Sequence, residues 1–506
     1  MLSRPLCGIS DSGYGRGRLA GKCTRTSGSE ARVALVCASG ALALGALLGY
    51  AGPLIAVAAV AALALAAWAL GDLDVALWGM IAIVALLPFG APPIDIGLTP
   101  TFLDLAMGGA LVVYLMQWMT GRAALRHLRR RGLRPSLTPA HGPLAVFGAL
   151  AVFSFVAGLN NGPLTPYLLR HFAELLLSLG FAFVVVDHVD THRRLSRMAP
   201  AIVLCGAAAA AIGIVLYVVP ADLAERALNG LRVFGYPTGA VLRYIEDNPE
   251  NAQRAISTSV DPNVLGGLLA MVGALAAPQI FAGAPLLGER LGNANARRLW
   301  SGAFGLIAAC LLLTFSRGAM LGLAVAVAGL GLARYRRLLW LALAAAAVVG
   351  LLPATQGYVA HLLEGLRGQD LATQMRFGEY KDALTLIGRY PLFGVGFAGA
   401  PDLDIYLGVA NAYLTITSEM GLVGLAAFLG VLGAIFGWAF VSRRQAEGVA
   451  PAVEPLWLGL HAGLVAALVV GLFDHYFFNL DFQPAGTIFW LFAGLALAAT
   501  RLARQA

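Results

Sequence analysis

Arg317 stands in the middle of an otherwise apolar run, Leu311–Val325, with the sequence LLLTFSRGAMLGLAV. A cation at the centre of a bilayer costs roughly 2.5–3.5 kcal/mol on insertion scales, so an arginine in such a run needs a reason. Two interpretations are open. Either the guanidinium points into a polar cavity and binds an anion, or the side chain extends along apolar surface to the headgroups and anchors its helix.

More arginines gather in two polar stretches of the chain. The first stretch contains Arg226, Arg232, Arg243 and Arg254, and the second contains Arg367, Arg376, Lys381 and Arg389. A guanidinium presents a planar fork of N–H donors, so clustered arginines suit bidentate recognition of phosphate. Alternatively, some of them form ordinary solvated ion pairs, as Arg376 and Glu379 can at a spacing of i,i+3.

The composition places these arginines in a membrane protein. Of the 506 residues, 59% are hydrophobic and 12% are charged, whereas soluble domains carry about 25% charged residues. We therefore predict an all-α, polytopic helical protein with about 12–14 transmembrane helices. The candidate spans are 33–50, 53–70, 74–90, 101–119, 143–158, 166–186, 199–219, 263–283, 299–315, 319–333, 338–352, 420–440, 456–473 and 485–500.

The loops between these spans separate by charge. Basic loops recur at 121–134, 192–197, 289–298 and 334–337, and most of the Lys and Arg residues lie in them, in the first 32 residues or at the C-terminal end. Cytoplasmic loops carry the excess of Lys and Arg, so this set is expected to face the cytoplasm, with both termini inside. The net charge of +8 is then explained by the basic cytoplasmic loops, and no nucleic-acid partner is predicted.

The same pattern predicts how the chain is divided. A disordered cytoplasmic tail (1–31) precedes N-terminal spans (32–219), and an external loop (220–262) follows them. Further spans (263–352) precede a large external loop (353–419) and the C-terminal spans (420–506). Loops of such length inside a folded protein are usually functional.

Arg317 is expected near the outer face. The apolar segment 299–333 is too long for one helix across a core of about 30 Å, and Ser-Arg-Gly divides it into two. Because the first of the two enters from a basic loop, Arg317 lies at the outer end of a helical hairpin. In the large loop we predict an amphipathic helix from Leu371 to Ile387, ended by Pro391 and Gly394.

Three motif-like stretches do not carry chemistry. GRLAGKCT in the tail is not a phosphate loop, because that motif needs Gly at position 16 and Ser or Thr at position 23, where this chain has Arg16 and Cys23. GVGFAG at 394–399 fits G-x-G-x-x-G without the strand and helix that a dinucleotide site requires, and we expect it to allow tight backbone turning or close approach to a ligand. Asp-Leu-Asp at 402–404 lies on the outer side, where nucleotide sugars are not expected.

The order of these landmarks resembles the bacterial O-antigen ligase and O-antigen polymerase family. The similar stretches are STSVDPNVLGGLLA (257–270), LLLTFSRGAMLGL (311–323), MRFGEYKDALTLIGRYPLFGVGFAG (375–399), NAYLTITSEMGLVGLAAFL (411–429) and DHYFFNLDFQPAGTIFWLFAGLAL (474–497). The resemblance implies a glycosyltransferase in the bacterial inner membrane. It transfers glycan from an undecaprenyl-pyrophosphate-linked oligosaccharide to an acceptor glycan or glycolipid at the outer face, among membrane lipid. Neither a metal nor another cofactor is implied.

The resemblance also assigns candidate site residues. Arg317 matches the family's Ser-Arg-Gly arginine and is expected to hold pyrophosphate in catalysis, where fixed guanidinium groups stabilise the departing negative charge. Arg376 matches the arginine that opens the family's loop helix, and Arg254 is a plausible second clamp. The remaining substrate-binding candidates are Arg389, Asn411, Tyr413 and Glu419. For Asp261 and Asn263 an equal alternative is that they only cap the helix that follows, and Glu419 has a structural alternative too.

One position departs from the family pattern. Ligases typically carry a histidine before the asparagine of the NAYL stretch, and here that position is Ala410. This favours a polymerase-like role or a base from elsewhere. His475, next to Asp474, is the candidate catalytic base, and a purely structural His-Asp pair is the alternative.

Two other classes of membrane protein remain open. A flippase or transporter for lipid-linked glycan carries charges deep in its spans and often internal repeats, whereas here the charges concentrate at one face. A non-catalytic protein that assists polysaccharide export is the second alternative.

Overall fold

Helices make up nearly all the regular structure of the residues that the structure describes. This computed structural model describes residues 72–92, 99–124, 137–351, 356, 360, 367–368, 371–399, 409–448 and 453–505. The predicted tail (1–31), the predicted spans 33–50 and 53–70 and the Asp-x-Asp motif (402–404) lie outside these residues.

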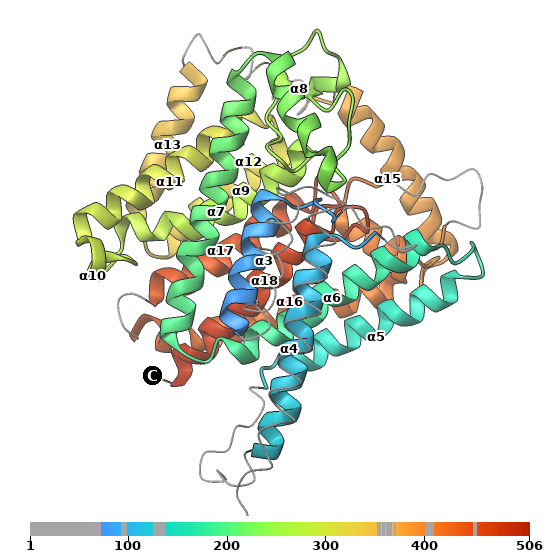
Figure 1. The fold of residues 1–506 in the computed structure, drawn as a ribbon, viewed down its shortest axis with the longest axis horizontal. Helices are drawn as coiled ribbons and strands as arrows, with labels where there is room; N and C mark the ends of the chain where they lie inside the picture. Colours follow the sequence, from blue (N-terminus) through green and yellow to red (C-terminus); the bar gives the residue numbers. More distant parts are fainter. Residues whose placement is uncertain are drawn as a thin grey trace, which may run out of the picture. The chain divides into compact units, whose positions relative to one another are not determined.

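Figure 1 shows the order of the elements along the chain. The N-terminal helices are α3 (Leu73–Leu86), α4 (Phe102–Ala124), α5 (His141–Gly158), α6 (Pro166–His188), α7 (His192–Val218) and α8 (Ala221–Asn229). The two-residue strands β1 (Arg243–Tyr244) and β2 (Gln253–Arg254) then form a hairpin. The later helices are α9 (Pro262–Phe281), α10 (Gly288–Leu291), α11 (Asn293–Leu313), α12 (Arg317–Ala333), α13 (Arg336–Leu351), α15 (Leu371–Arg389), α16 (Ala412–Gly448), α17 (Glu454–Val470) and α18 (Gln483–Gln505).

The prediction of an all-α polytopic membrane protein is confirmed. Every predicted span that falls on described residues coincides with a helix. Among the described helices, 7 are long and apolar enough to cross a membrane, and α3, α4, α12 and α17 contain shorter apolar segments. The chain is therefore a multi-pass membrane protein.

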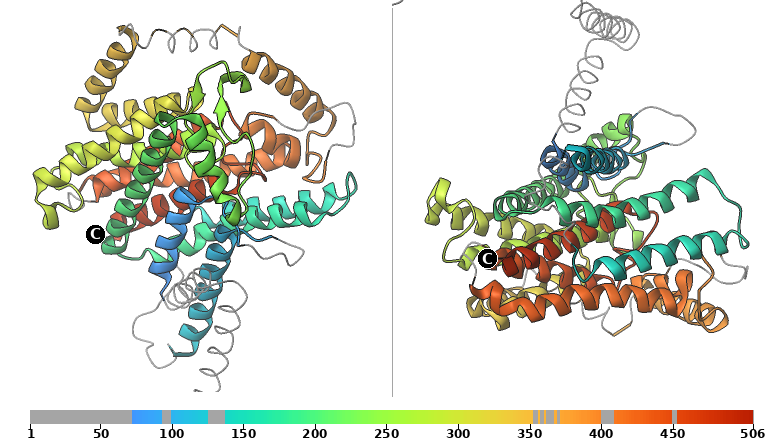
Figure 2. Two further views of the ribbon diagram at one scale, coloured as in Figure 1. Left: turned by 45° about the horizontal axis from the view of Figure 1, so that its top comes forward. Right: turned by 90° about the horizontal axis from the view of Figure 1, so that it is seen from below.

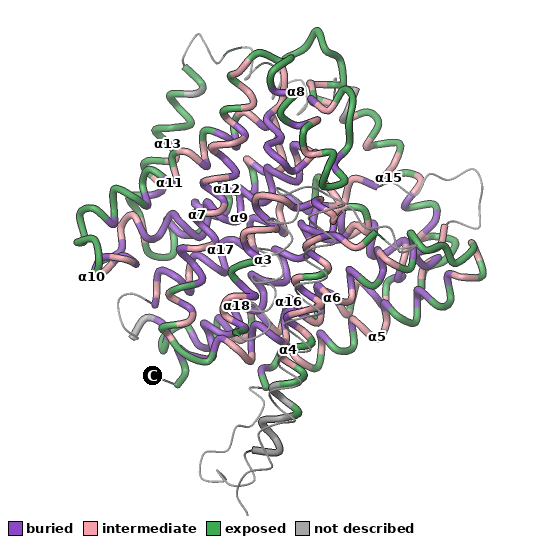
Figure 3. Tube along the Cα trace, viewed as in Figure 1, coloured by how far each residue is buried: buried purple, intermediate pink, exposed green. Residues whose placement is uncertain are grey.

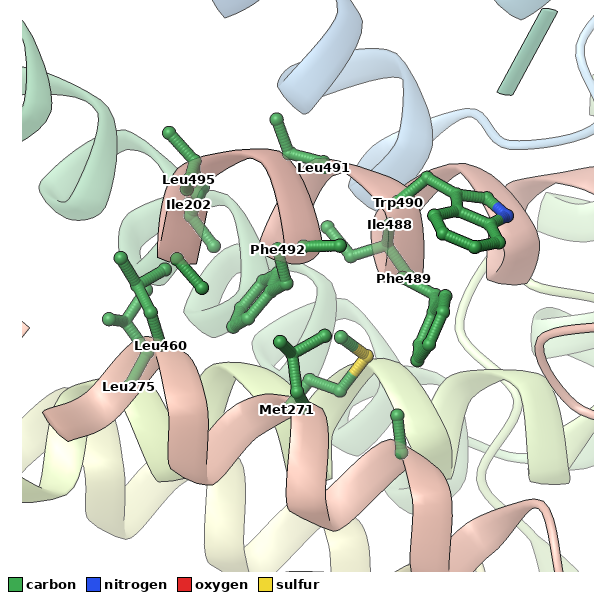
Figure 4. Close-up of a cluster of buried hydrophobic side chains, with 14 of the residues drawn as sticks. Ile202, Met271, Leu275, Leu460, Ile488, Phe489, Trp490, Leu491, Phe492 and Leu495 are labelled. Carbon is green, nitrogen blue, oxygen red and sulfur yellow. The ribbon is translucent and has the colours of Figure 1, made fainter. Parts of the chain in front are cut away.

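Two of these helices, α9 and α18, are buried along almost their whole length and form the centre of the described unit (Figure 3). Helix α17 packs against both of them, and α18 also packs against α6 and α16 (Figure 2). Figure 4 shows Phe489 and Phe492 of α18 close to Met271 of α9. At Gly463 of α17 an added Cβ would lie 2.5 Å from the Phe492 ring, so this close helix contact requires the missing side chain.

Helix α16 is interrupted at Gly421, whose φ of 70° is not helical. The segment 391–399, which contains GVGFAG, satisfies the backbone on both sides of this interruption. Val395 N and Gly396 N donate to the carbonyls of Ser418 and Glu419, both at 2.9 Å, and Leu422 N donates to Pro391 O at 2.8 Å. Gly394 (φ 67°) and Gly396 (φ 79°) make the turns that this insertion needs, so the prediction of tight turning is confirmed.

Helix α15 confirms the amphipathic helix predicted for the large loop, including its end before Pro391. The apolar face expected from the sequence, with Met375, Ala383 and Leu384 on it, packs only in part, however. Ala383 and Leu386 are buried, whereas Met375 and Leu384 are each 60% exposed. The packed face also includes Arg376, Glu379 and Tyr380: Arg376 lines the pocket described next, and the other two side chains bind the backbone of Ala410.

Candidate active site

Arg317 opens helix α12 directly after a three-residue turn that follows α11. Phe315 in this turn has a φ of 53°, a conformation that is rare for a bulky residue. Thr314 supports the turn, since its Oγ1 donates to Leu311 O at 2.7 Å and accepts from Ser316 N at 3.2 Å. The predicted division of the apolar segment at Ser-Arg-Gly is thus confirmed, and Arg317 is the first residue of the second helix.

Arg254, at the end of β2, is bound to the same turn. Its Nε donates to Thr314 O at 2.9 Å, and one terminal nitrogen donates to Asn263 Oδ1 at 3.0 Å. Burial lowers the pKa of the Arg254 guanidinium, and the nearby Asp261 carboxylate opposes this shift. A guanidinium remains charged at neutral pH even so. The sequence left open whether Asn263 only caps α9, and it did not indicate that Asn263 orients Arg254.

Asp261 caps helix α9, as one of the two interpretations held. Its Oδ1 accepts from Asn263 N at 2.7 Å and from Val264 N at 3.0 Å. This carboxylate therefore satisfies two backbone donors that have no partner within the helix.

The three arginines Arg254, Arg317 and Arg376 line one pocket. The space between the lining atoms, with its open mouth, has a volume of about 570 Å³. Arg254 comes from β2, Arg317 from the start of α12 and Arg376 from α15. Three segments that are far apart in sequence thus each contribute an arginine to the lining of this pocket.

Several groups in the wall of the pocket attract anions. Besides the three guanidinium groups, Ser316 and Gly318 place the N-terminal end of α12 in its wall. The N-terminal end of a helix carries a partial positive charge and N–H groups without partners inside the helix, both of which favour phosphate. A guanidinium group binds phosphate oxygens through two parallel N–H donors, so three arginines in one pocket suit a ligand that carries phosphate.

Two carboxylates, Glu246 and Asp474, also line the pocket, whereas His475 is not among its lining residues. His475 Nδ1 lies 3.2 Å from Asp474 Oδ1, and the side chains are 31% and 16% exposed respectively. Burial raises the pKa of the Asp474 carboxyl, and the neighbouring His475 acts in the opposite direction. Of the two neighbouring residues, the structure therefore places Asp474 in the pocket wall and His475 next to Asp474.

Helix α15 is hydrogen-bonded to the backbone of Ala410. Glu379 Oε2 accepts from Ala410 N at 2.9 Å, and the Tyr380 hydroxyl lies 3.2 Å from Ala410 O and 3.3 Å from Leu472 O. The Glu379 carboxylate thus has a backbone partner, whereas the spacing in the sequence also allowed an ion pair with Arg376. These contacts fix α15, and with it Arg376, to the two segments that precede α16 and Asp474.

The other predicted substrate-binding residues do not line the pocket. Asn411 caps α16, since its Oδ1 accepts from Tyr413 N and Leu414 N at 3.0 Å, and its Nδ2 donates to Leu472 O at 2.9 Å. The Tyr413 hydroxyl donates to Leu468 O at 2.8 Å. Glu419 lies at the interruption of α16, and Arg389 is the exposed last residue of α15. Their roles in substrate binding stay predictions.

The fold and the pocket together define a class: a multi-pass helical membrane protein with an arginine-lined pocket. A family model described as O-antigen ligase matches residues 302–429. The resemblance to the O-antigen ligase and polymerase family is thereby confirmed for this part of the chain, about a quarter of its length. The protein accordingly carries a domain of the O-antigen ligase and polymerase type, which serves polysaccharide assembly. A search of curated proteins finds no match.

The matched stretch contains Arg317 and Arg376 and ends before Asp474. The pocket also needs Arg254, Glu246 and Asp474 from outside the stretch. Glu246 was missed entirely by sequence reasoning, because nothing near it in the sequence indicates that the hairpin folds back over the arginines.

Proposed function

We propose that this protein transfers a glycan from an undecaprenyl-pyrophosphate-linked donor to an acceptor hydroxyl at the outer face of the inner membrane. The observation that supports this most is the convergence of Arg254, Arg317 and Arg376 on one pocket. Three guanidinium groups match a diphosphate, and a lipid diphosphate is the diphosphate that such a pocket in a membrane protein meets.

The proposed step forms one glycosidic bond and breaks one glycosyl–phosphate bond. The acceptor hydroxyl oxygen attacks the anomeric carbon of the donor's reducing-end sugar. The bond from that carbon to the pyrophosphate oxygen breaks, and its electron pair leaves with undecaprenyl pyrophosphate. The guanidinium groups and the α12 N-terminus stabilise the charge that grows on the leaving oxygen, which is the part of the reaction that fixed donors accelerate most.

Asp474 is the group that we propose takes the proton from the acceptor hydroxyl. It lines the pocket, and its raised pKa makes it a stronger base than an ordinary carboxylate. His475 acts as a positioning residue behind it, 3.2 Å from its Oδ1. This replaces the catalytic role that the sequence suggested for His475.

Polymerisation is favoured over ligation to a lipid acceptor, because Ala410 stands where ligases carry histidine. The Ala410 backbone is held by Glu379 and Tyr380, and its methyl group has no acid–base chemistry. The product in this proposal is a surface polysaccharide, either O-antigen or exopolysaccharide. The distribution of basic loops supports a pocket that faces outward, with both termini in the cytoplasm.

Vesicles with the purified protein and a lipid-linked oligosaccharide test this proposal. The wild type is expected to extend or transfer the glycan without any ion gradient. A flippase would change only the sidedness of the lipid, and a binding protein would change neither its length nor its sidedness. Either result in place of glycan transfer would contradict the proposal.

The matched variants in this assay lie at the two ends of α12. Arg317→Ala is expected to be inactive. Arg334→Ala is the control, since Arg334 follows the other end of α12 and pairs with Glu454 at 3.1 Å, away from the pocket. It removes an arginine directly after the same helix and is expected to transfer glycan normally.

A further inference from the structure

The β1–β2 hairpin carries a carboxylate into the arginine pocket. Arg243 pairs with Arg254 and Tyr244 with Gln253 in antiparallel register. Ile245 N donates to Ala252 O at 3.1 Å and Asn251 Nδ2 donates to Ile245 O at 3.0 Å, so the turn is closed directly around Glu246. The same short hairpin therefore fixes Glu246 relative to Arg254.

The turn holds Glu246 in a conformation that side chains disfavour. Glu246 has a φ of 57° and Asp247 a φ of 52°, and both are residues with a Cβ in the left-handed region. Two such residues in succession persist only where the surrounding structure imposes them, and they often mark functional sites. Of the two, only Glu246 lines the pocket.

A carboxylate among three guanidinium groups does not serve anion binding, because it repels a diphosphate. It suits the group that is bonded to the diphosphate. The reducing-end sugar carries hydroxyl donors, and its anomeric carbon becomes positively charged as the leaving group departs. A carboxylate accepts hydrogen bonds from hydroxyls and stabilises positive charge on such a carbon. Glu246 is exposed, which places it at the open side of the pocket, where the glycan must emerge.

We infer that Glu246 contacts the reducing-end sugar of the donor, accepting hydrogen bonds from its hydroxyls and stabilising the positive charge that develops at its anomeric carbon. This inference rests on the proposed function. Glu246 takes no proton in this role and forms no bond to the sugar. It acts on the sugar, whereas Arg254, Arg317 and Arg376 act on the diphosphate.

Two measurements on purified protein test this role: the kinetics of glycan transfer, and the binding of undecaprenyl pyrophosphate, which has no sugar. Glu246→Gln is expected to lower kcat/KM for transfer at least tenfold and to leave the Kd for undecaprenyl pyrophosphate unchanged or lower. Asp247→Asn is the matched control, because it removes the neighbouring carboxylate from the same kind of backbone conformation, outside the pocket lining. It is expected to behave as the wild type.

Glu246→Gly guards against a folding artefact. Glycine adopts a positive φ readily, so this variant is expected to be as thermally stable as the wild type and to lose transfer to the same extent as Glu246→Gln. Wild-type transfer by either Glu246 variant would overturn the inference, as would a parallel loss of undecaprenyl pyrophosphate binding. If instead the wild type neither binds undecaprenyl pyrophosphate nor transfers glycan, the proposed function itself fails, which is a separate result.

Discussion

Two interruptions of apolar helices can be compared in this structure. One is the turn between α11 and α12 at Thr314–Ser316, and the other is the break in α16 at Gly421. Both contain a residue with positive φ, 53° at Phe315 and 70° at Gly421. Segment 391–399 closes the break in α16 with backbone hydrogen bonds, whereas the α11–α12 turn opens the N-terminus of α12 to a pocket lined by arginines.

This difference separates a structural interruption from a functional one. Irregular backbone at membrane depth is tolerated where protein covers it or where it lines a polar cavity. The α16 break is of the first kind and the α11–α12 turn is of the second. Changes at the first are therefore expected to affect folding, and changes at the second are expected to affect chemistry.

The largest effect is expected at Arg317. Arg317→Ala removes one fixed cation from the charge that develops on the leaving group, and such losses cost about 10²–10³-fold in rate. Arg317→Lys is expected to recover little of this, since an ammonium lacks the planar fork. Transfer assays and thermal unfolding in detergent on the same samples check the contrast. We expect Arg317→Ala to unfold at the wild-type temperature but to lose activity. Wild-type transfer by this variant would contradict the view that the α11–α12 turn is functional.

Asp474 and His475 are expected to differ in their pH profiles. As the base, Asp474 must be ionised, so kcat rises with pH through its raised pKa, at higher pH than for an ordinary carboxyl. Asp474→Asn is expected to lose about 10²–10⁴-fold in kcat. His475 lowers the pKa of Asp474, so His475→Gln should shift the rising limb to still higher pH and keep activity at its plateau. If His475→Gln abolished transfer at every pH, His475 and not Asp474 would be the base.

At the α16 break the expected effect is on stability. Gly421→Ala puts a Cβ at positive φ and 2.1 Å from Leu392 O. The backbone conformation alone costs roughly 1–3 kcal/mol, and the clash adds to it. Gly430→Ala is the control on the same helix, because an added Cβ there meets nothing within 4 Å. Thermal unfolding measures both, and activity per folded molecule is expected to fall little. A fully stable but inactive Gly421→Ala would mean that this break also serves catalysis.

The smallest effect is expected at Tyr380. Tyr380→Phe removes a hydroxyl that binds Ala410 O or Leu472 O, a loss of about 0.5–1.5 kcal/mol, and loosens the α15 helix that carries Arg376. We expect a rise of a few fold in KM for the lipid-linked donor. Thr385→Ala on the same helix is the control, since its hydroxyl bonds only to Lys381 O of its own helix. Equal effects of the two changes on KM would mean that the hydrogen bonds from Tyr380 to Ala410 and Leu472 do not help to position Arg376.

The sequence predicted the helices well because span length and apolar content are local properties. The division at Ser-Arg-Gly and the end of α15 before Pro391 both follow from such local signals. The start of α7 was predicted too late, because Thr191 accepts from Arg194 N and so extends the helix into the basic loop. The packed face of α15 was misjudged, because polar residues face inward where they build a site.

The partners within the site could not be predicted from local signals. That Asn263 orients Arg254, that Glu379 holds Ala410 and that Glu246 reaches the pocket all depend on contacts between distant segments. The same holds for Asp474, since neighbouring residues in a loop point in different directions and only coordinates tell which of the two faces the pocket.

Binding of undecaprenyl pyrophosphate to the purified protein tests the central claim most directly, namely that three guanidinium groups hold one diphosphate. We predict that Arg254→Ala, Arg317→Ala and Arg376→Ala each raise the Kd at least tenfold, and that Arg243→Ala, which alters the hairpin partner of Arg254 outside the pocket, leaves it within about twofold of the wild type. Wild-type affinity in Arg317→Ala would contradict the account.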